Sequence, residues 1–333
     1  MNFLVAGGAG FIGKHLSRYL LTRFPGIRLK IVDNLSSGSS LDDDIIRDCR
    51  VSFFKQDLVN LNALVEVMNG VDHVFHLAAN PDISKGESDP DLDFREGTML
   101  TRNVLEAARI NNVGKVFFTS GSGVYGDRSE LAFTESFGPC APVSPYGAAK
   151  LCSEALISAY CHMFSMTGIV LRFANVVGPN QTHGVGYDFI NRLHVDRTQL
   201  KILGNGEQSK SYIHITDVLN AIDAVLEASS GSTLFEVYNV ATEDHISVTE
   251  IARMACKVSG VDPASVRFIY TGGLRGWNGD VPIVRLDTHK IRSIGWKNRL
   301  SAAEAIESSL SSMFKRRLDH VIESFGETSG EDF

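Results

Sequence analysis

Short apolar runs alternate with longer amphipathic stretches along the first half of the chain. The apolar runs predict strands, and stretches with apolar residues every three or four positions predict helices. The predicted strands are 2–6, 29–32, 51–54, 71–77 and 115–120, and the predicted helices are 14–21, 61–68 and 97–111. Strands that alternate with helices build a parallel sheet with helices on both faces. The pattern therefore predicts an α/β fold with a doubly wound parallel sheet.

A glycine-rich turn, GGAGFIG at residues 7–13, joins the first predicted strand to the first predicted helix. Gly7 permits the tight turn, Gly10 lets a pyrophosphate approach the backbone, and Gly13 lets the helix pack closely on the strand. Free amides at the helix start attract the phosphate charge. A glycine turn in an unrelated α/β protein is the alternative. The strand before the turn and the helix after it favour a dinucleotide site.

Asp33 ends the second apolar run, about twenty residues after the last glycine of the turn. A carboxylate at this place accepts hydrogen bonds from the adenosine ribose hydroxyls and repels a 2′-phosphate. The sequence therefore predicts a Rossmann-type sheet that binds NAD rather than NADP.

Tyr146 and Lys150 are four residues apart in a stretch that predicts a helix, so their side chains lie on one face. A nearby ammonium favours the phenolate, so we expect the pKa of the tyrosine to be lowered. Such a tyrosine can act as a general acid or base near neutral pH. The spacing also arises by chance in many helices. The pair gains weight because it lies downstream of the dinucleotide site.

Composition and charge restrict the class of protein further. The 333 residues suggest about two domains. A net charge of −7 argues against a nucleic-acid partner, and no apolar run approaches the ~20 residues of a membrane span. The five cysteines are scattered, which favours reduced thiols over disulfides or zinc. We expect a cytoplasmic enzyme with no metal site and no membrane contact.

Further motifs carry a family resemblance. They are HLAA at 76–79, VYG at 124–126, RFANVVGP at 172–179 and GDV at 279–281. With the glycine turn, Asp33 and the tyrosine–lysine pair, they make residues 1–310 resemble the extended short-chain dehydrogenase/reductases. Among these, the chain is similar to the NAD-dependent nucleotide-sugar epimerase/dehydratase family, and in particular to UDP-glucose 4-epimerases.

The resemblance implies an activity and a cofactor site. The implied activity is inversion of C4 of a UDP-hexose (UDP-glucose and UDP-galactose, or also UDP-GlcNAc and UDP-GalNAc) through a transient 4-keto sugar. Tyr146 would take the O4 proton while hydride leaves C4 for NAD, and Lys150 would bind the nicotinamide ribose. The implied cofactor-binding residues are Gly7, Gly10, Phe11, Ile12, Gly13, Asp33, Asn34, Asp57, Leu58, Leu77, Ala78, Ala79, Tyr146 and Lys150.

Two departures from the family pattern bear on the chemistry. The Ser or Thr that hydrogen-bonds the reacting hydroxyl in relatives is replaced by Gly121. Ser120 or Ser122 could supply the missing hydroxyl, and we slightly favour Ser122. Sugar 4,6-dehydratases place Asp-Glu directly before VYG, where this chain has Ser122 and Gly123. Because neither residue can expel water across C5 and C6, we expect an epimerase rather than a dehydratase.

The resemblance also implies how the chain divides. Residues 1–174 would form the NAD-binding domain, with returning segments near 210–245. Residues 175–315 would mainly form a smaller, interleaved substrate domain, and 316–333 a frayed tail. The implied substrate-binding residues are Asn175, Tyr187, Lys210, Arg275 and Val284.

Two of these residues can also be interpreted without any contact to the substrate. Arg275 suits a diphosphate better than Lys210 because its guanidinium is bidentate, but it could equally be a solvated surface arginine. Val284 stands where a bulky aromatic restricts relatives to UDP-glucose and UDP-galactose. A small side chain there implies that UDP-GlcNAc also fits. The alternative is that Val284 is a strand residue facing the core.

Other interpretations stay open. The chain could be a UDP-glucuronate 4-epimerase, a 4-keto-sugar reductase that consumes external NADH, or a non-catalytic NAD-binding sensor or scaffold. Non-catalytic relatives usually lack the tyrosine–lysine pair that this chain has. Relatives dimerise through a four-helix bundle, so we expect a homodimer that uses the helix at 148–163.

Overall fold

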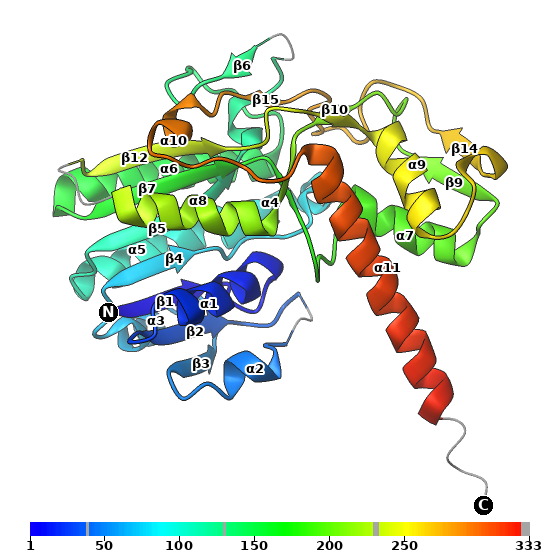
Figure 1. The fold of residues 1–333 in the computed structure, drawn as a ribbon. Helices are drawn as coiled ribbons and strands as arrows, with labels where there is room; N and C mark the ends of the chain where they lie inside the picture. Colours follow the sequence, from blue (N-terminus) through cyan, green and yellow to red (C-terminus); the bar gives the residue numbers. More distant parts are fainter. Residues whose placement is uncertain (38–39, 129–130, 229–232, 328–333) are drawn as a thin grey trace, which may run out of the picture.

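A seven-stranded parallel sheet is the centre of the fold (Figure 1). The computed structural model describes all residues except 38–39, 129–130, 229–232 and 328–333. The strand order is β12-β7-β5-β4-β1-β2-β3, and all neighbours run parallel. The strands are β1 (Asn2–Ala6), β2 (Arg28–Asp33), β3 (Val51–Lys55), β4 (His73–His76), β5 (Lys115–Gly121), β7 (Thr167–Phe173) and β12 (Phe235–Val240). The predicted doubly wound parallel sheet is confirmed.

Side chains along the strands alternate between two apolar cores. In β1, Phe3 and Val5 belong to the core that contains Leu16 of the first helix. Leu4 and Ala6 belong to the core on the opposite face. Helices α1 and α8 pack on the first core, and α3, α5 and α6 pack on the second. Their bounds are α1 (Phe11–Arg23), α3 (Leu61–Met68), α5 (Leu100–Ile110), α6 (Pro145–Phe164) and α8 (Ile215–Ala228). Burial on both faces explains why these strands are continuous apolar runs.

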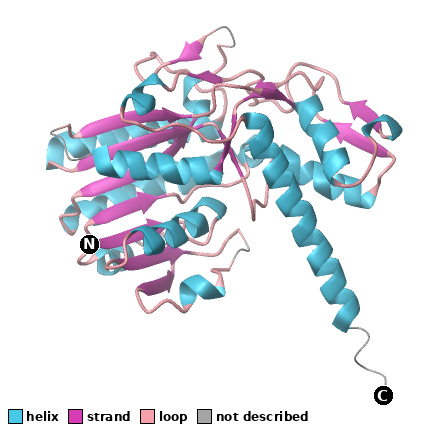
Figure 2. Ribbon diagram, in the orientation of Figure 1, coloured by secondary structure: helices cyan, strands magenta, loops and turns pink. Residues whose placement is uncertain are grey.

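A smaller unit with a third apolar core lies at the carboxyl ends of the strands (Figures 1 and 2). Its helices are α7 (Val185–Val195), α9 (Val248–Val258) and α11 (Ala302–Glu327). In the described part of the chain, three two-stranded sheets contribute to it: β8 (Asn175–Val177) with β11 (Tyr212–His214), β9 (Gln199–Ile202) with β14 (Arg267–Tyr270), and β10 (Ser209–Lys210) with β13 (Ile246–Ser247). A further pair, β6 (Ala132–Phe133) with β15 (Arg285–Leu286), packs on the first core. The remaining short helices are α2 (Asp43–Ile46), α4 (Pro90–Asp93) and α10 (His289–Ser293).

The helix predicted at 97–111 begins later than its pattern suggests. Residues Phe94–Met99 form a π-helical segment, η2, and α5 follows from Leu100. A side chain at Gly97 would bring its Cβ to 3.0 Å from the Cβ of Ala149 in α6. The glycine therefore lets η2 and α6 approach closely. Short π-helical segments of this kind often occur at functional sites.

The carboxyl-terminal part of the chain differs from its prediction. A frayed tail was expected from 316, but the structure continues α11 to Glu327, and 328–333 lie outside the described residues. Leu310 and Met313 anchor the first half of α11 in the third core, and each further residue of a formed helix adds one hydrogen bond. Among the described residues, no helix combines the length and the apolar character needed to cross a bilayer.

Candidate functional site

A cavity of about 900 Å³ lies between the sheet and the smaller unit, at the carboxyl ends of the strands. Its lining includes every residue of the predicted NAD site, from Gly7 to Lys150. Ser120, Ser122, Asn175, Lys210 and Val284 line the same cavity. Residues that are far apart in the sequence therefore meet in one place, where parallel sheets bind their ligands.

The glycine turn is closely packed where it faces the cavity. Gly7 has φ +82°, and a Cβ there would lie 2.6 Å from the backbone nitrogen of Ala78. A Cβ on Gly13 would lie 2.4 Å from the carbonyl oxygen of Gly7. The N-cap of α1 is Gly10, which offers no side-chain cap, and the first turn contains no acid. The amides at the start of α1 therefore remain available to an anion, which fits the pyrophosphate of NAD.

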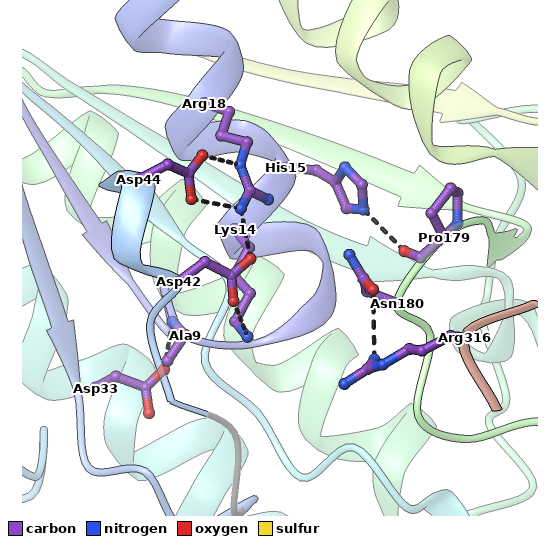
Figure 3. Close-up of polar contacts among 10 residues, drawn as sticks. All are labelled: Ala9, Lys14, His15, Arg18, Asp33, Asp42, Asp44, Pro179, Asn180 and Arg316. Carbon is purple, nitrogen blue, oxygen red and sulfur yellow. Dashed lines mark hydrogen bonds and ion pairs between the residues drawn. The ribbon is translucent and has the colours of Figure 1, made fainter. Parts of the chain in front are cut away.

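Asp33 is held in place at the end of β2 (Figure 3). One carboxylate oxygen accepts the backbone N–H of Ala9 at 2.9 Å, and the other accepts that of Leu35 at 2.8 Å. Next to it, Asn34 donates to the carboxylate of Asp57 at 3.0 Å. These residues form the acidic adenosine end of the cavity. The negative charge there fits ribose hydroxyls and opposes a 2′-phosphate.

Ion pairs fasten the segment after β2 onto α1 (Figure 3). Asp42 accepts from Lys14 at 2.8 Å and from Arg18 at 2.5 Å. Arg18 also pairs with Asp44 at 2.6 Å. On the other side of α1, a His15 ring nitrogen lies 2.9 Å from the carbonyl oxygen of Pro179. Helix α1 thus connects the adenosine end of the cavity with the segment that follows β8.

Lys150 is deeply buried at the opposite end of the cofactor cavity. The side chain is 4% exposed, and its Nζ donates to the carbonyl oxygen of Thr119 at 2.7 Å. The Nζ lies 4.7 Å from the ring centroid of Phe118 and 5.6 Å from that of Tyr146. Burial lowers the pKa of Lys150 to about 8, although Glu154 and Asp93 oppose the shift. The lysine is therefore mainly an ammonium at neutral pH.

The expected lowering of the Tyr146 pKa is wrong for the protein without ligand. Burial raises the pKa of Tyr146 to about 12, and the charge of Asp93 adds to the rise. Asp93 is 1% exposed and accepts a hydrogen bond from Asn80 at 3.0 Å through one oxygen. Its other oxygen has no hydrogen-bond partner among the described residues. Desolvation and a buried carboxylate thus outweigh the neighbouring ammonium.

The two candidate serines differ in their surroundings. The hydroxyl of Ser120 donates to Glu154 at 2.5 Å, and Glu154 pairs with Arg172 at 2.6 Å. Both charged side chains are buried. Ser122 lines the cavity, and within the described residues its hydroxyl makes no hydrogen bond to the protein. Ser122 is therefore the serine whose hydroxyl is free to meet a ligand.

Two of the five predicted substrate residues do not line the cavity. Tyr187 packs on the third core, and α7 lines the cavity with Gly186 and Asp188 together with Val185, Phe189 and Arg192, which lie at i, i+4 and i+7. This i, i+4, i+7 spacing is visible in the sequence and could have identified Arg192. Arg275 is not among the residues that line the cavity. Its guanidinium pairs with Asp127 at 2.5 Å, a contact that no local pattern reveals.

Lys210 reaches the cavity but is already paired. Its Nζ lies 2.5 Å from a carboxylate oxygen of Asp280. The same carboxylate accepts the backbone N–H of Gly276 at 3.0 Å, and the carbonyl oxygen of Asp280 accepts from Arg275 at 2.7 Å. Asp280 therefore organises the loop that closes this end of the cavity. No group of three or more His, Cys, Asp or Glu side chains in the described part of the chain is arranged to hold a metal ion.

The lowered pKa of Lys150 predicts a pH-dependent stability. Between its folded pKa of about 8 and the ordinary value of 10.5, the unfolded chain binds a proton that the folded protein has lost. The free energy of unfolding therefore rises with pH in this window, and burial of the ammonium costs stability below it. Urea unfolding at pH 7 and pH 10 should show wild type gaining stability relative to Lys150→Met. A difference between the two proteins that does not change with pH would contradict the assignment.

Comparison with known proteins shows the family. A model of the NAD dependent epimerase/dehydratase family matches residues 3–241. The UDP-glucose 4-epimerase of Mycolicibacterium smegmatis is 31% identical over 317 residues, which cover 92% of this chain and 96% of that protein. A trifunctional UDP-glucose 4,6-dehydratase/UDP-4-keto-6-deoxy-D-glucose 3,5-epimerase/UDP-4-keto-L-rhamnose-reductase of Arabidopsis thaliana is 28% identical over 321 residues. The match covers 93% of this chain but 46% of that protein, so the chain spans about half its length.

Solved structures agree with this result. A UDP-galactose 4-epimerase has a TM-score of 0.83 at 33% identity, over 95% of this chain and 99% of that one. The UDP-glucuronic acid 4-epimerase of Bacillus cereus, solved with UDP-glucuronic acid and NAD, has a TM-score of 0.84 at 27% identity, over 95% of this chain and 100% of that one. The cavity residues fit NAD, as described above. The chain belongs to the NAD-dependent epimerase/dehydratase family.

Proposed function

We propose that this chain is a nucleotide-sugar 4-epimerase that inverts C4 of a UDP-hexose with NAD as its cofactor. The observation that carries the proposal is that Tyr146 and Lys150 line the NAD cavity, which the free hydroxyl of Ser122 also lines. The pair offers one proton-transfer group and one cation where the reacting sugar carbon would lie. The similarity to UDP-sugar 4-epimerases supports the same activity.

Tyr146, Lys150 and Ser122 each have one role in the proposed reaction. Tyr146 accepts the proton of the 4-hydroxyl and later returns it to the inverted alcohol. Because the pKa of Tyr146 is about 12 even with the Lys150 ammonium 5.6 Å from its ring centroid, the phenol needs a further positive charge to act as a base, and the nicotinamide ring of NAD would supply one when bound. Ser122 donates to the same sugar oxygen and orients it. NAD, when bound, supplies the hydride acceptor and donor at C4.

The site lacks the acid and base that dehydration of the sugar would need. Expelling water across C5 and C6 requires an acid and a base beside the sugar, and the positions before VYG carry Ser122 and Gly123. The buried acids Glu154 and Asp93 are not among the residues that line the cavity. Glu154 is paired with Arg172, and Asp93 accepts from Asn80. Redox chemistry at a single carbon is therefore the reaction that these residues support.

Lys210 and Arg275, the cations predicted for the substrate end, are both paired with carboxylates. Arg192 also lines the cavity, and its guanidinium donates to a backbone carbonyl oxygen rather than to a carboxylate. The charges of the lining therefore do not exclude the carboxylate of UDP-glucuronate. Its 4-epimerisation remains the second candidate, because the similar Bacillus cereus structure holds UDP-glucuronic acid. Val284 lines the cavity with a small side chain, so we extend the proposal to UDP-GlcNAc.

The proposal predicts turnover without added cofactor. Purified protein should convert UDP-glucose into UDP-galactose, observed by NMR, while its NAD stays bound. Tyr146→Phe should lower kcat at least about 100-fold, because proton transfer is lost, and should keep the NAD. Stoichiometric consumption of added NADH would instead identify a reductase. If the protein binds NAD but turns over none of UDP-glucose, UDP-GlcNAc and UDP-glucuronate, the proposed activity is wrong and the result favours a non-catalytic sensor or scaffold.

The two serines form a matched pair of variants. Ser122→Ala should lower kcat at least about tenfold, because one donor to the reacting oxygen is removed. Ser120→Ala should keep kcat within about twofold but lower the free energy of unfolding by about 1–3 kcal/mol, because Glu154 loses a buried donor. Steady-state kinetics and urea unfolding measure the two effects. Equal losses of kcat in both variants would contradict the assignment.

We also propose that the protein is a homodimer that packs α5 and α6 against their copies in a four-helix bundle. Exposed apolar side chains at the ends of these helices support it: Ile110 in α5, and Met163 and Phe164 in α6. Analytical ultracentrifugation at micromolar concentration should give twice the 36.4 kDa of one chain. Met163→Glu should shift the equilibrium toward monomer. A purely monomeric wild type would overturn the proposal.

A further inference from the structure

Trp277 lines the cavity, but it has no part in the cofactor site or in the proton transfer described so far. The residue lies in the loop between β14 and β15 and lines the cavity together with Ser144 and Tyr146. Within the described residues, its indole N–H has no hydrogen-bond partner. The ring is therefore partly exposed to the cavity and its donor is free. Because the residue is only half-buried, both the flat face and the N–H of the indole can meet a ligand.

Gly279 makes room for this indole. The backbone of Gly279 is not in the left-handed region that favours glycine, so its conformation does not require the residue. Its surroundings do: a Cβ there would lie 2.3 Å from Cζ3 and 2.5 Å from Cη2 of Trp277. The same Cβ would lie 3.0 Å from the Cβ of Ser144. The indole thus folds back onto Gly279, close to the residue that caps α6 two positions before Tyr146.

Contacts on both sides of Trp277 fix the loop across the cavity. Before it, Arg275 pairs with Asp127, which directly follows the VYG motif. After it, the side-chain amide of Asn278 donates to Glu87 in the 3₁₀ segment Ile83–Glu87. Both partners belong to the NAD-binding unit. The loop is therefore attached at two points to the part of the protein that carries Tyr146, and the indole lies between these points.

The position of the indole relative to Tyr146 identifies what it would meet. The reacting carbon must lie at Tyr146, so the sugar ring occupies the part of the cavity next to Ser144 and Gly279. A pyranose presents an apolar C–H face and a rim of hydroxyls. An indole offers a flat apolar face together with one N–H donor, which matches both features.

We propose that Trp277 stacks on the hexose ring of the substrate and that Gly279 is required to seat it. This inference rests on the proposed function and names the part of the UDP-sugar that the loop recognises. Trp277 acts as a specificity-determining residue, since it recognises the sugar rather than the nucleotide. It transfers no proton itself. Arg275 and Asn278 are positioning residues, because they act through the loop.

Tryptophan fluorescence tests the proposal directly. The chain has two tryptophans, and Trp296 is buried with its N–H donating to the carbonyl oxygen of Asp217, outside the cavity lining. In wild type, UDP-glucose should change the emission, whereas UDP at saturation should change it little. Trp277→Phe, in which Trp296 alone emits, should show no change with either ligand. An equal response of wild type to UDP and UDP-glucose would overturn the proposal.

Binding measurements give an independent result. By calorimetry, Trp277→Ala should weaken binding of UDP-glucose about fivefold to tenfold and leave UDP within about twofold. Gly279→Ala should reproduce this selective loss, because its Cβ displaces the indole, and Trp277→Phe should recover part of the affinity. An unchanged affinity of Trp277→Ala for UDP-glucose would sink the inference while the proposed function stands. If wild type binds no UDP-sugar at all, the proposed function fails as well.

Discussion

The burial of one ammonium group, that of Lys150, is the constraint on which the site depends. A cation removed from water is costly unless its hydrogen bonds are satisfied. Here the Nζ donates to the carbonyl oxygen of Thr119 and lies over the ring of Phe118. The lysine therefore ties α6 to the end of β5. Because Tyr146 is one turn earlier in α6, this contact also fixes the phenol at the end of the sheet.

The close approach of α6 to its neighbours depends on small residues. Gly97 in the π-helical segment leaves space for Ala149, the residue before Lys150. The glycine is therefore a packing feature of this site.

The smaller unit closes the other side of the cavity through charged contacts. Asp280 holds Lys210 and the backbone around Gly276, while Arg275 reaches across to Asp127. These pairs position the loop that carries Trp277.

The features of the fold and of the site that depend on local sequence could be predicted. The glycine turn, Asp33 and the strand pattern are short-range features, and the structure arranges them as expected. The raised pKa of Tyr146 could not be predicted, because Asp93 approaches from a segment more than fifty residues away in the chain. The same holds for Arg275 and Asp127, which are 148 residues apart. Tyr187 differs, because the helical spacing of Val185, Phe189 and Arg192 in the sequence already indicates a face of α7 that does not include it.

The central claim is that Tyr146 and a retained NAD exchange a proton and a hydride with one sugar carbon. The most direct measurement follows deuterium in UDP-[4-²H]glucose, incubated in ordinary water with protein as purified and no added cofactor. The account predicts UDP-galactose that keeps its deuterium at C4, because the hydride leaves and returns without reaching solvent. Product that has lost deuterium to water, or deuterium that moves to another carbon, would contradict it.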